Sequence, residues 1–155
     1  MLSDTPKHGN LFIVAAPSVG GKTSLIRALL KFDQQLALSI SHTTRQARPG
    51  EEDSQHYHFV SVVEFEQMVE NGEFVEHAHV FDNLYGTSHK AIVSKLDEGR
   101  DVLLDIDWQG ARQVRTGFPD CCSIFNKFNK LLLFFCIEFW FFFRSVFLFI
   151  HYRPL

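Results

Sequence analysis

The chain has 155 residues, of which 46% are hydrophobic and 21% are charged, and its formal net charge is -3. This length and composition suit one compact domain and exclude a disordered tail protein and a collagen-like repeat. The balance of charge excludes the broad basic surface of a nucleic-acid-binding protein, so a local site must hold any anionic ligand.

Cysteine usage and the first ten residues predict a cytoplasmic protein. Cys121, Cys122 and Cys136 form neither a disulfide framework nor a C-x-x-C zinc pair. Residues 1–10 are polar and lack the apolar segment of a secretory signal. We therefore expect a reducing compartment.

The first predicted elements are a strand, a glycine-containing loop and a helix. Residues 11–15, LFIVA, are a continuous apolar run typical of a buried parallel strand, and apolar residues recur at helical spacing from Leu25 to Leu30. Between them, residues 16–23 read APSVGGKT, which matches the phosphate-binding loop except that Ala16 replaces the first glycine. The order of elements predicts a nucleotide phosphate site, and a simple small-residue turn is the alternative.

This loop assigns roles to its residues by their chemistry. Its backbone N–H groups can surround phosphate oxygens at the positive end of the following helix. Lys22 is expected to reach the β- and γ-phosphates, and Thr23 to ligate Mg²⁺. The predicted ATP-binding residues are Ala16, Pro17, Ser18, Val19, Gly20, Gly21, Lys22 and Thr23.

Two arginines follow in a segment rich in hydroxyl groups. Residues 41–51 read SHTTRQARPGE and place Arg45 and Arg48 three apart. Beside a phosphate loop, two guanidinium groups predict a clamp on a second phosphate. The alternative is a solvated loop whose arginines pair with nearby acids such as Glu51.

Two amphipathic helices are predicted next, over residues 62–71 before Gly72 and over residues 88–98 before Gly99. We expect their apolar stripes to lie in the core. The pairs His56/His58 and His77/His79 each suit one face of a strand, where exposed sheet positions are favoured over a metal site.

A second buried strand is predicted over residues 101–107, DVLLDID, which ends in carboxylates. At a strand's carboxyl end, Asp105 or Asp107 can hold the water shell of a metal in phosphate-loop enzymes. The alternative is that one of them caps a helix that begins near Trp108.

Six blocks in order resemble bacterial guanylate kinases: APSVGGKT, SHTTRQARPGE, HYHFV, EFVEHA, YGTS and LLDIDWQGA, within residues 10–125. The resemblance implies an α/β fold, a parallel sheet of the phosphate-loop nucleoside monophosphate kinase type with a small GMP-binding insertion at about residues 40–88. It also implies ATP-dependent phosphorylation of GMP with Mg²⁺, by a kinase-like domain over residues 1–125.

The resemblance also implies roles for individual residues. Ser41, Arg45, Arg48, Tyr57 and Tyr85 would hold the GMP phosphate, and Glu76 and Thr87 would read the guanine. The expected catalytic residues are Lys22, Arg45, Arg48 and Asp107, and the expected Mg²⁺ ligands are Thr23 and, through water, Asp105. A carboxylate accepts from guanine N1–H and the exocyclic amine, whereas adenine lacks that pattern.

The resemblance stops after Phe125, and nine of the 17 phenylalanines lie in residues 126–155. This apolar tail suggests an abnormal terminus from out-of-frame or truncated coding; a membrane segment over residues 131–150 and an ordinary aromatic core are the alternatives. Since relatives continue with a lid that carries arginines, we expect an incomplete sheet and impaired turnover.

Two other functions compete with the kinase. A catalytically dead guanylate-kinase-like binding module would be expected to have a degraded phosphate loop, whereas Lys22 and Thr23 are intact. A GTPase would use Asp107 to Gly110 as D-x-x-G, but residues 126–129, NKFN, lack the final aspartate of N-K-x-D. We expect ATP and GMP as partners and no nucleic acid, and a homo-oligomer is compatible with the sequence.

Overall fold

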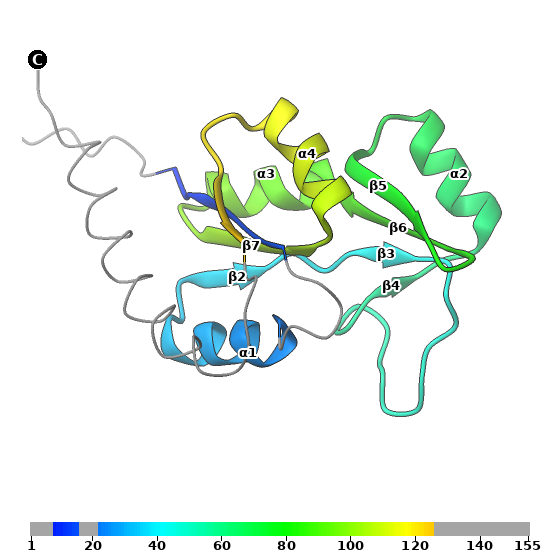
Figure 1. The fold of residues 1–155 in the computed structure, drawn as a ribbon, viewed down its shortest axis with the longest axis horizontal. Coiled ribbons are helices and arrows are strands. Elements are labelled where there is room, and N and C mark those ends of the chain that lie inside the picture. Colours follow the sequence, from blue (N-terminus) through cyan, green and yellow to red (C-terminus); the bar gives the residue numbers. More distant parts are fainter. Residues whose placement is uncertain (1–7, 16–21, 126–155) are drawn as a thin grey trace, which may run out of the picture.

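A computed structural model describes residues 8–15 and 22–125 of the chain (Figure 1). In chain order the elements are β1 (Leu11–Ala15), α1 (Lys22–Phe32), β2 (Leu36–Leu38), β3 (His42–Thr43), β4 (His58–Phe59), α2 (Val62–Glu70), β5 (Phe74–Val80), β6 (Asn83–Ser88), α3 (His89–Asp97), β7 (Asp101–Ile106), α4 (Trp108–Gly117) and β8 (Cys122–Phe125). They form two four-stranded sheets.

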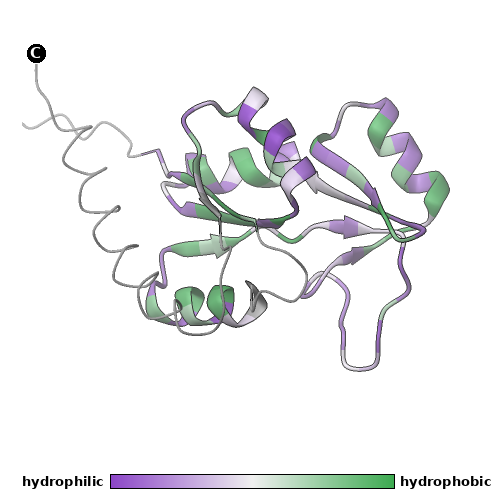
Figure 2. Cartoon of the chain, viewed as in Figure 1, coloured by the Kyte–Doolittle hydropathy of each residue, from purple (hydrophilic) through white to green (hydrophobic). Residues whose placement is uncertain are grey.

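The core sheet has the order β2-β7-β1-β8, and every pairing in it is parallel. Alternate residues of β1 face opposite sides: Ile13 packs with the buried residues of α3 and α4, and Val14 packs with those of α1. Because both faces are covered, β1 is apolar at all five positions (Figure 2). The predicted α/β fold with a parallel sheet is confirmed.

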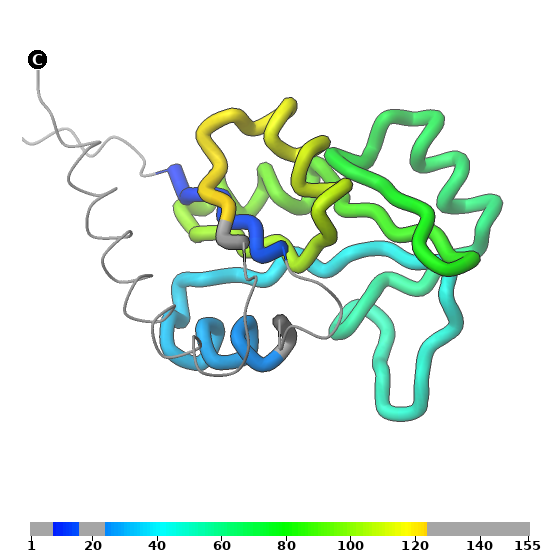
Figure 3. Tube along the Cα trace, viewed as in Figure 1, coloured from blue at the N-terminus to red at the C-terminus, as the bar shows by residue number. Residues whose placement is uncertain are grey.

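The second sheet has the order β4-β3-β6-β5 and draws its strands from residues 42–88. Its largest pairing is the antiparallel hairpin of β5 and β6. Strand β3 runs antiparallel to β6 and parallel to β4. The segment that joins β3 to β4 extends away from both sheets (Figure 3).

The predicted helices are present, with ends set by their caps. Ser61 and Ser88 accept backbone N–H groups at the starts of α2 and α3. Gly72 and Gly99 follow the two helices with positive φ angles of 67° and 75°, as a helix stop requires.

The prediction that the apolar stripe of α2 lies in the core is only partly right. Phe65 is buried, but Val62 and Val63 are 51% and 64% exposed. They occupy the first turn of α2, beyond the hairpin surface that Phe65 covers by stacking on Phe74. Within the described ranges, no helix is long and apolar enough to cross a membrane. The predicted tail, including residues 131–150, lies outside them.

Candidate nucleotide-binding site

At the carboxyl edge of the core sheet, the ends of β1 and β7 lie side by side. Ala15 pairs with Ile106 at the ends of β1 and β7, so the loop after β1 and the carboxylate of Asp107 start from the same edge. Residues 16–21 of the predicted phosphate loop lie outside the described residues. Lys22 and Thr23 open α1, and their side chains are likewise outside the description.

The second sheet contributes a buried chain of three polar side chains. Glu76 on β5 and Thr87 on β6 are cross-strand partners, 4% and 0% exposed. The Thr87 hydroxyl donates to Glu76 Oε1 at 2.5 Å and lies 3.2 Å from the Ser41 hydroxyl. The two residues expected to read guanine are therefore in contact, with a predicted phosphate-binding serine beside them.

The environment of Glu76 makes its carboxyl group a weak acid. Burial raises its pKa from 4.5 to about 7, the hydrogen bond from Thr87 opposes the rise, and the charge of Asp107 adds to it. A buried carboxyl group with a pKa near 7 can ionise and accept hydrogen bonds once a ligand supplies donors in place of water. It is thus suited to a ligand that presents N–H groups.

Tyr57, Tyr85 and Arg45 form an aromatic and cationic group next to this chain. The two tyrosine rings meet edge to face with centroids 6.1 Å apart, and the Arg45 guanidinium carbon lies 5.4 Å from the Tyr57 centroid. Burial first, and then the carboxylate of Asp105, raise the pKa of Tyr57. Its hydroxyl therefore remains a hydrogen-bond donor at neutral pH.

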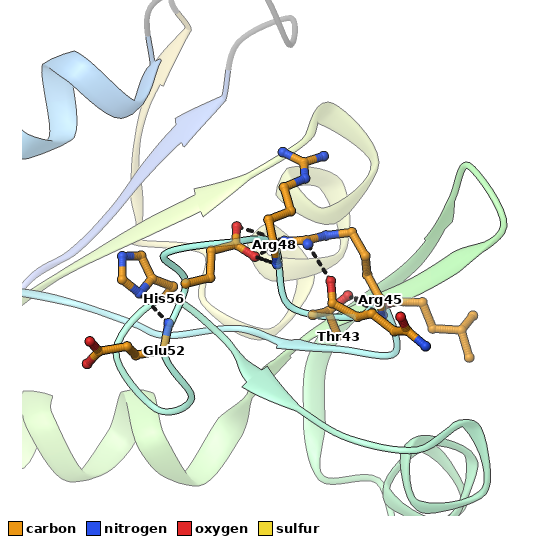
Figure 4. A network of polar contacts seen from close by, with 8 residues as sticks. Thr43, Arg45, Arg48, Glu52 and His56 are labelled. Atoms are coloured by element: carbon orange, nitrogen blue, oxygen red, sulfur yellow. Dashed lines mark hydrogen bonds and ion pairs between the residues drawn. The ribbon is translucent and has the colours of Figure 1, made fainter.

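The segment after β3 presents the two predicted arginines differently (Figure 4). The Thr43 hydroxyl accepts the Arg45 backbone N–H at 3.2 Å, and the Arg45 guanidinium donates to Glu51 at 3.0 Å. Glu51 also accepts the Arg48 backbone N–H at 2.8 Å. The guanidinium of Arg48 is exposed and extends away from this network (Figure 4).

Pairing of Arg45 with Glu51 is the alternative that the sequence left open for these arginines, and it is present. This pairing is compatible with a phosphate clamp, because a bound phosphate can share the Arg45 guanidinium with the Glu51 carboxylate or take the place of that carboxylate. The hydrogen bond from the Arg48 N–H, followed by Arg45, lowers the pKa of Glu51.

Asp107 caps α4, as the alternative interpretation of this residue predicts. Its Oδ1 accepts the N–H groups of Gln109 and Gly110 at 2.9 and 2.8 Å. Strand β7 ends at Ile106, so the predicted strand 101–107 is one residue too long. Asp105 is half-buried on β7, opposite Val14 of β1. The D-x-x-G resemblance to a GTPase is thus a helix start.

The histidine pairs do not form a metal centre in the described part of the chain, where no group of three metal-ligating side chains occurs. His77 and His79 are exposed on β5, as expected. The prediction of a strand face for His56 is wrong: β4 contains only His58 and Phe59, and the His56 ring accepts the Glu52 N–H within a turn (Figure 4).

Two residues of α4 contact the site in a way that the sequence did not predict: Gly110, which the sequence suggested only as part of D-x-x-G, and Gln113. Gly110 packs directly against the Glu76 side chain. The Gln113 side chain bonds both backbone groups of His77, the residue that follows Glu76. No spacing rule signals such a contact between a helix and a strand 36 residues away, so only the fold reveals it.

Comparisons with known proteins agree on one family. A family model described as guanylate kinase matches residues 8–131. The guanylate kinase of Chromohalobacter salexigens is 58% identical over 120 residues, which cover 77% of this chain and 56% of that protein. That of Idiomarina loihiensis is 57% identical over 126 residues, covering 80% and 60%.

A crystal structure of guanylate kinase from Anaplasma phagocytophilum superposes with a TM-score of 0.66 at 36% identity, covering 77% of this chain and 60% of that one. The chain therefore spans less than two thirds of the length of these relatives.

Proposed function

The chain belongs to the guanylate kinase family, and we propose that it transfers the terminal phosphoryl group of ATP to GMP, giving ADP and GDP. The observation that carries the proposal is the buried contact between Glu76 and Thr87, with Ser41 beside it. Burying a polar group costs free energy unless the group is hydrogen-bonded. The Glu76 carboxyl group accepts one hydrogen bond within its sheet, from the Thr87 hydroxyl, so its remaining lone pairs suit the donors of a ligand.

Guanine supplies the donors that Glu76 lacks. Its N1–H and exocyclic amine can both donate to the carboxylate, and the Thr87 hydroxyl can donate to O6 once it turns from Glu76. Adenine presents an acceptor at N1 and carries no amine at position 2, so it would offer the Glu76 carboxylate no donor where guanine offers two. A site built in this way rejects the wrong base strongly.

The GMP phosphate is assigned to Ser41, Arg45, Arg48, Tyr57 and Tyr85. Support comes from the contact of Arg45 with Tyr57, from the tyrosine pair, and from the exposed Arg48 guanidinium. Two guanidinium groups and two phenol donors match the geometry and charge of a phosphate monoester.

ATP is assigned to residues 16–23 at the end of β1, with Mg²⁺ held by Thr23 and, through water, by Asp105. Their oxygen ligands suit this ion, and the pairing of Asp105 with Val14 supports a position next to the strand that leads into the loop. The ion would neutralise phosphate charge during transfer. We assign the kinase unit to residues 1–125 and its GMP-binding insertion to about residues 40–88.

Catalysis then rests on positioning and charge neutralisation. Lys22 would hold the β- and γ-phosphates, while Arg45 and Arg48 orient the GMP phosphate and balance its charge. Asp107, fixed as the cap of α4, would face the acceptor nucleotide. The insertion sheet selects the acceptor and the core sheet presents the donor.

A coupled assay of ADP release tests the proposal on the full chain. We expect ATP-dependent phosphorylation of GMP and not of AMP, and a loss of at least about a hundredfold in kcat/KM for Lys22→Ala. Lys31→Ala is the matched control, because Lys31 is an exposed lysine at the other end of α1. Equal turnover of the two monophosphates, or an active Lys22→Ala variant, would contradict the assignment.

A further inference from the structure

Gly110 occupies an unusual position for a glycine, buried in the first turn of α4. Its N–H donates to Asp107 Oδ1 at 2.8 Å, so it belongs to the cap of the helix. A β-carbon built at Gly110 would overlap Glu76 Oε2 and would lie 3.0 Å from Cδ and 3.4 Å from Cγ of the same side chain. The Glu76 carboxyl group therefore occupies the space that a side chain at position 110 would fill.

The contact is selective for that carboxyl group. The three atoms nearest to the added β-carbon all belong to Glu76. The φ angle of Gly110 is not positive, so its backbone conformation does not require glycine. Alanine has a higher helix propensity than glycine, so α4 by itself would be more stable with alanine at this position.

Gln113 lies one turn further along α4 and fixes the backbone next to Glu76. Its Oε1 accepts the His77 N–H at 3.1 Å, and its Nε2 donates to the His77 carbonyl at 2.9 Å. Strand β5 is at the edge of its sheet, and its pairing with β6 shifts register between Phe74 and Glu76. The side-chain amide of Gln113 thus takes the place of a neighbouring strand at this irregular point.

We propose that Gly110 and Gln113 are positioning residues that set guanine selectivity, since Gly110 gives the Glu76 carboxyl group its place and Gln113 fixes the strand that carries it. The inference rests on the proposed GMP site. It adds that selectivity depends on a face of α4 as well as on the residues that touch the base.

The test compares Gly110→Ala with Gly117→Ala by calorimetric titration of the full chain with GMP and with IMP, which lacks the exocyclic amine. Gly117 ends the same helix, and a β-carbon there meets no atom within 4 Å. We expect Gly110→Ala to weaken GMP binding at least about tenfold and IMP binding less, because displacing the carboxylate removes a charged partner. Its Tm should equal or exceed that of the unmutated chain.

A double-mutant cycle with Glu76→Gln distinguishes positioning from a general effect. If Gly110 acts through Glu76, Gly110→Ala causes no further loss of GMP selectivity over IMP in the Glu76→Gln background. Gln113→Ala should lower the same selectivity by a smaller factor. Additive losses in the cycle would overturn the proposal.

Three more outcomes distinguish the role of Gly110 from the proposed function and from simple packing. If the unmutated chain prefers GMP over AMP but Gly110→Ala leaves the ratio of GMP to IMP affinity unchanged, only the role of Gly110 is overturned. If the unmutated chain does not bind GMP, the proposed function fails and the inference with it. A Tm for Gly110→Ala several degrees below that of Gly117→Ala would identify a packing glycine and overturn the positioning role.

Discussion

At the scale of single residues, Glu76 combines burial, one hydroxyl donor and a neighbouring carboxylate. These surroundings raise its pKa to about 7, with burial as the largest cause. The Glu76 carboxyl group therefore titrates in the physiological range. It can lose its proton when the N–H groups of a nucleobase donate hydrogen bonds to it. In the proposed site, selectivity for guanine and sensitivity to pH would both arise from the Glu76 carboxyl group.

Stability should depend on pH through this residue. Because the folded pKa of about 7 exceeds the ordinary 4.5, the folded state binds the proton more tightly. The stabilising contribution is fully present below pH 4.5 and is lost as the pH rises through 7. The free energy of unfolding should fall by about 3 kcal/mol across this window on account of Glu76.

Urea unfolding at pH 5 and pH 8 checks this dependence, with Glu76→Gln as the comparison. His42 contributes with the opposite sign, because burial and then His58 lower its pKa. The difference between the two chains isolates Glu76. Equal changes in the unmutated chain and in Glu76→Gln would refute the assignment of the raised pKa.

The sequence could suggest the residues of the site but not their contacts. Glu76, Thr87 and Ser41 were expected to contact GMP only through a family resemblance, since a glutamate in an apolar strand has no signature of its own. The bond between Glu76 and Thr87 depends on the register of β5 and β6, and the contact of Ser41 with Thr87 depends on where the residue before β3 lies. Local sequence patterns specify neither. The role of Asp107 as a helix cap followed from its position alone.

At the scale of elements, the hairpin of β5 and β6 contains an unusual turn. Phe81 and Asp82 connect the strands with φ angles of 45° and 59°, which is the two-residue turn that suits the twist of a hairpin. Asparagine and glycine favour this conformation, whereas phenylalanine does not. Phe81 is also 88% exposed, so its ring gains little from burial.

We expect Phe81→Asn to stabilise the chain by up to about 1 kcal/mol, since asparagine tolerates positive φ angles. Phe81→Ala is the control, because it removes the ring and keeps the unfavourable backbone. Urea midpoints measured with equal slopes compare the two variants. A Phe81→Asn chain no more stable than Phe81→Ala would show that the backbone at this turn is not strained.

Elements with a clear apolar pattern followed from the sequence. Apolar runs and helical periodicity predicted β1, α2, α3 and β7 close to their observed ends, and the helical spacing from Leu25 to Leu30 indicated α1 without its ends. Strand β6 was not predicted, although it has six residues. Strands β2, β3 and β4 have two or three residues each, and tertiary pairing alone stabilises them. Val62 and Val63 are exposed at the start of α2, whereas Phe65 is the residue of α2 that packs on the hairpin, by stacking on Phe74.

At the scale of the whole molecule, α4 connects the two sheets. Ala111 and Val114 pack on the core sheet, while Gly110 and Gln113 contact β5 of the second sheet. The element that begins at the carboxyl edge of β7 thus adjoins the residues that would select the base. The donor and acceptor nucleotides would bind on opposite sides of the start of α4.

In the proposed function, the second sheet binds GMP through the Glu76 carboxylate. Titration calorimetry of the full chain with GMP and AMP at pH 7, in two buffers of different ionisation enthalpy, tests it most directly. We predict that GMP binds at least about tenfold more tightly than AMP and releases part of a proton, because the guanine N–H donors favour the carboxylate of a group with a pKa near 7. Equal affinities for the two nucleotides would contradict the account.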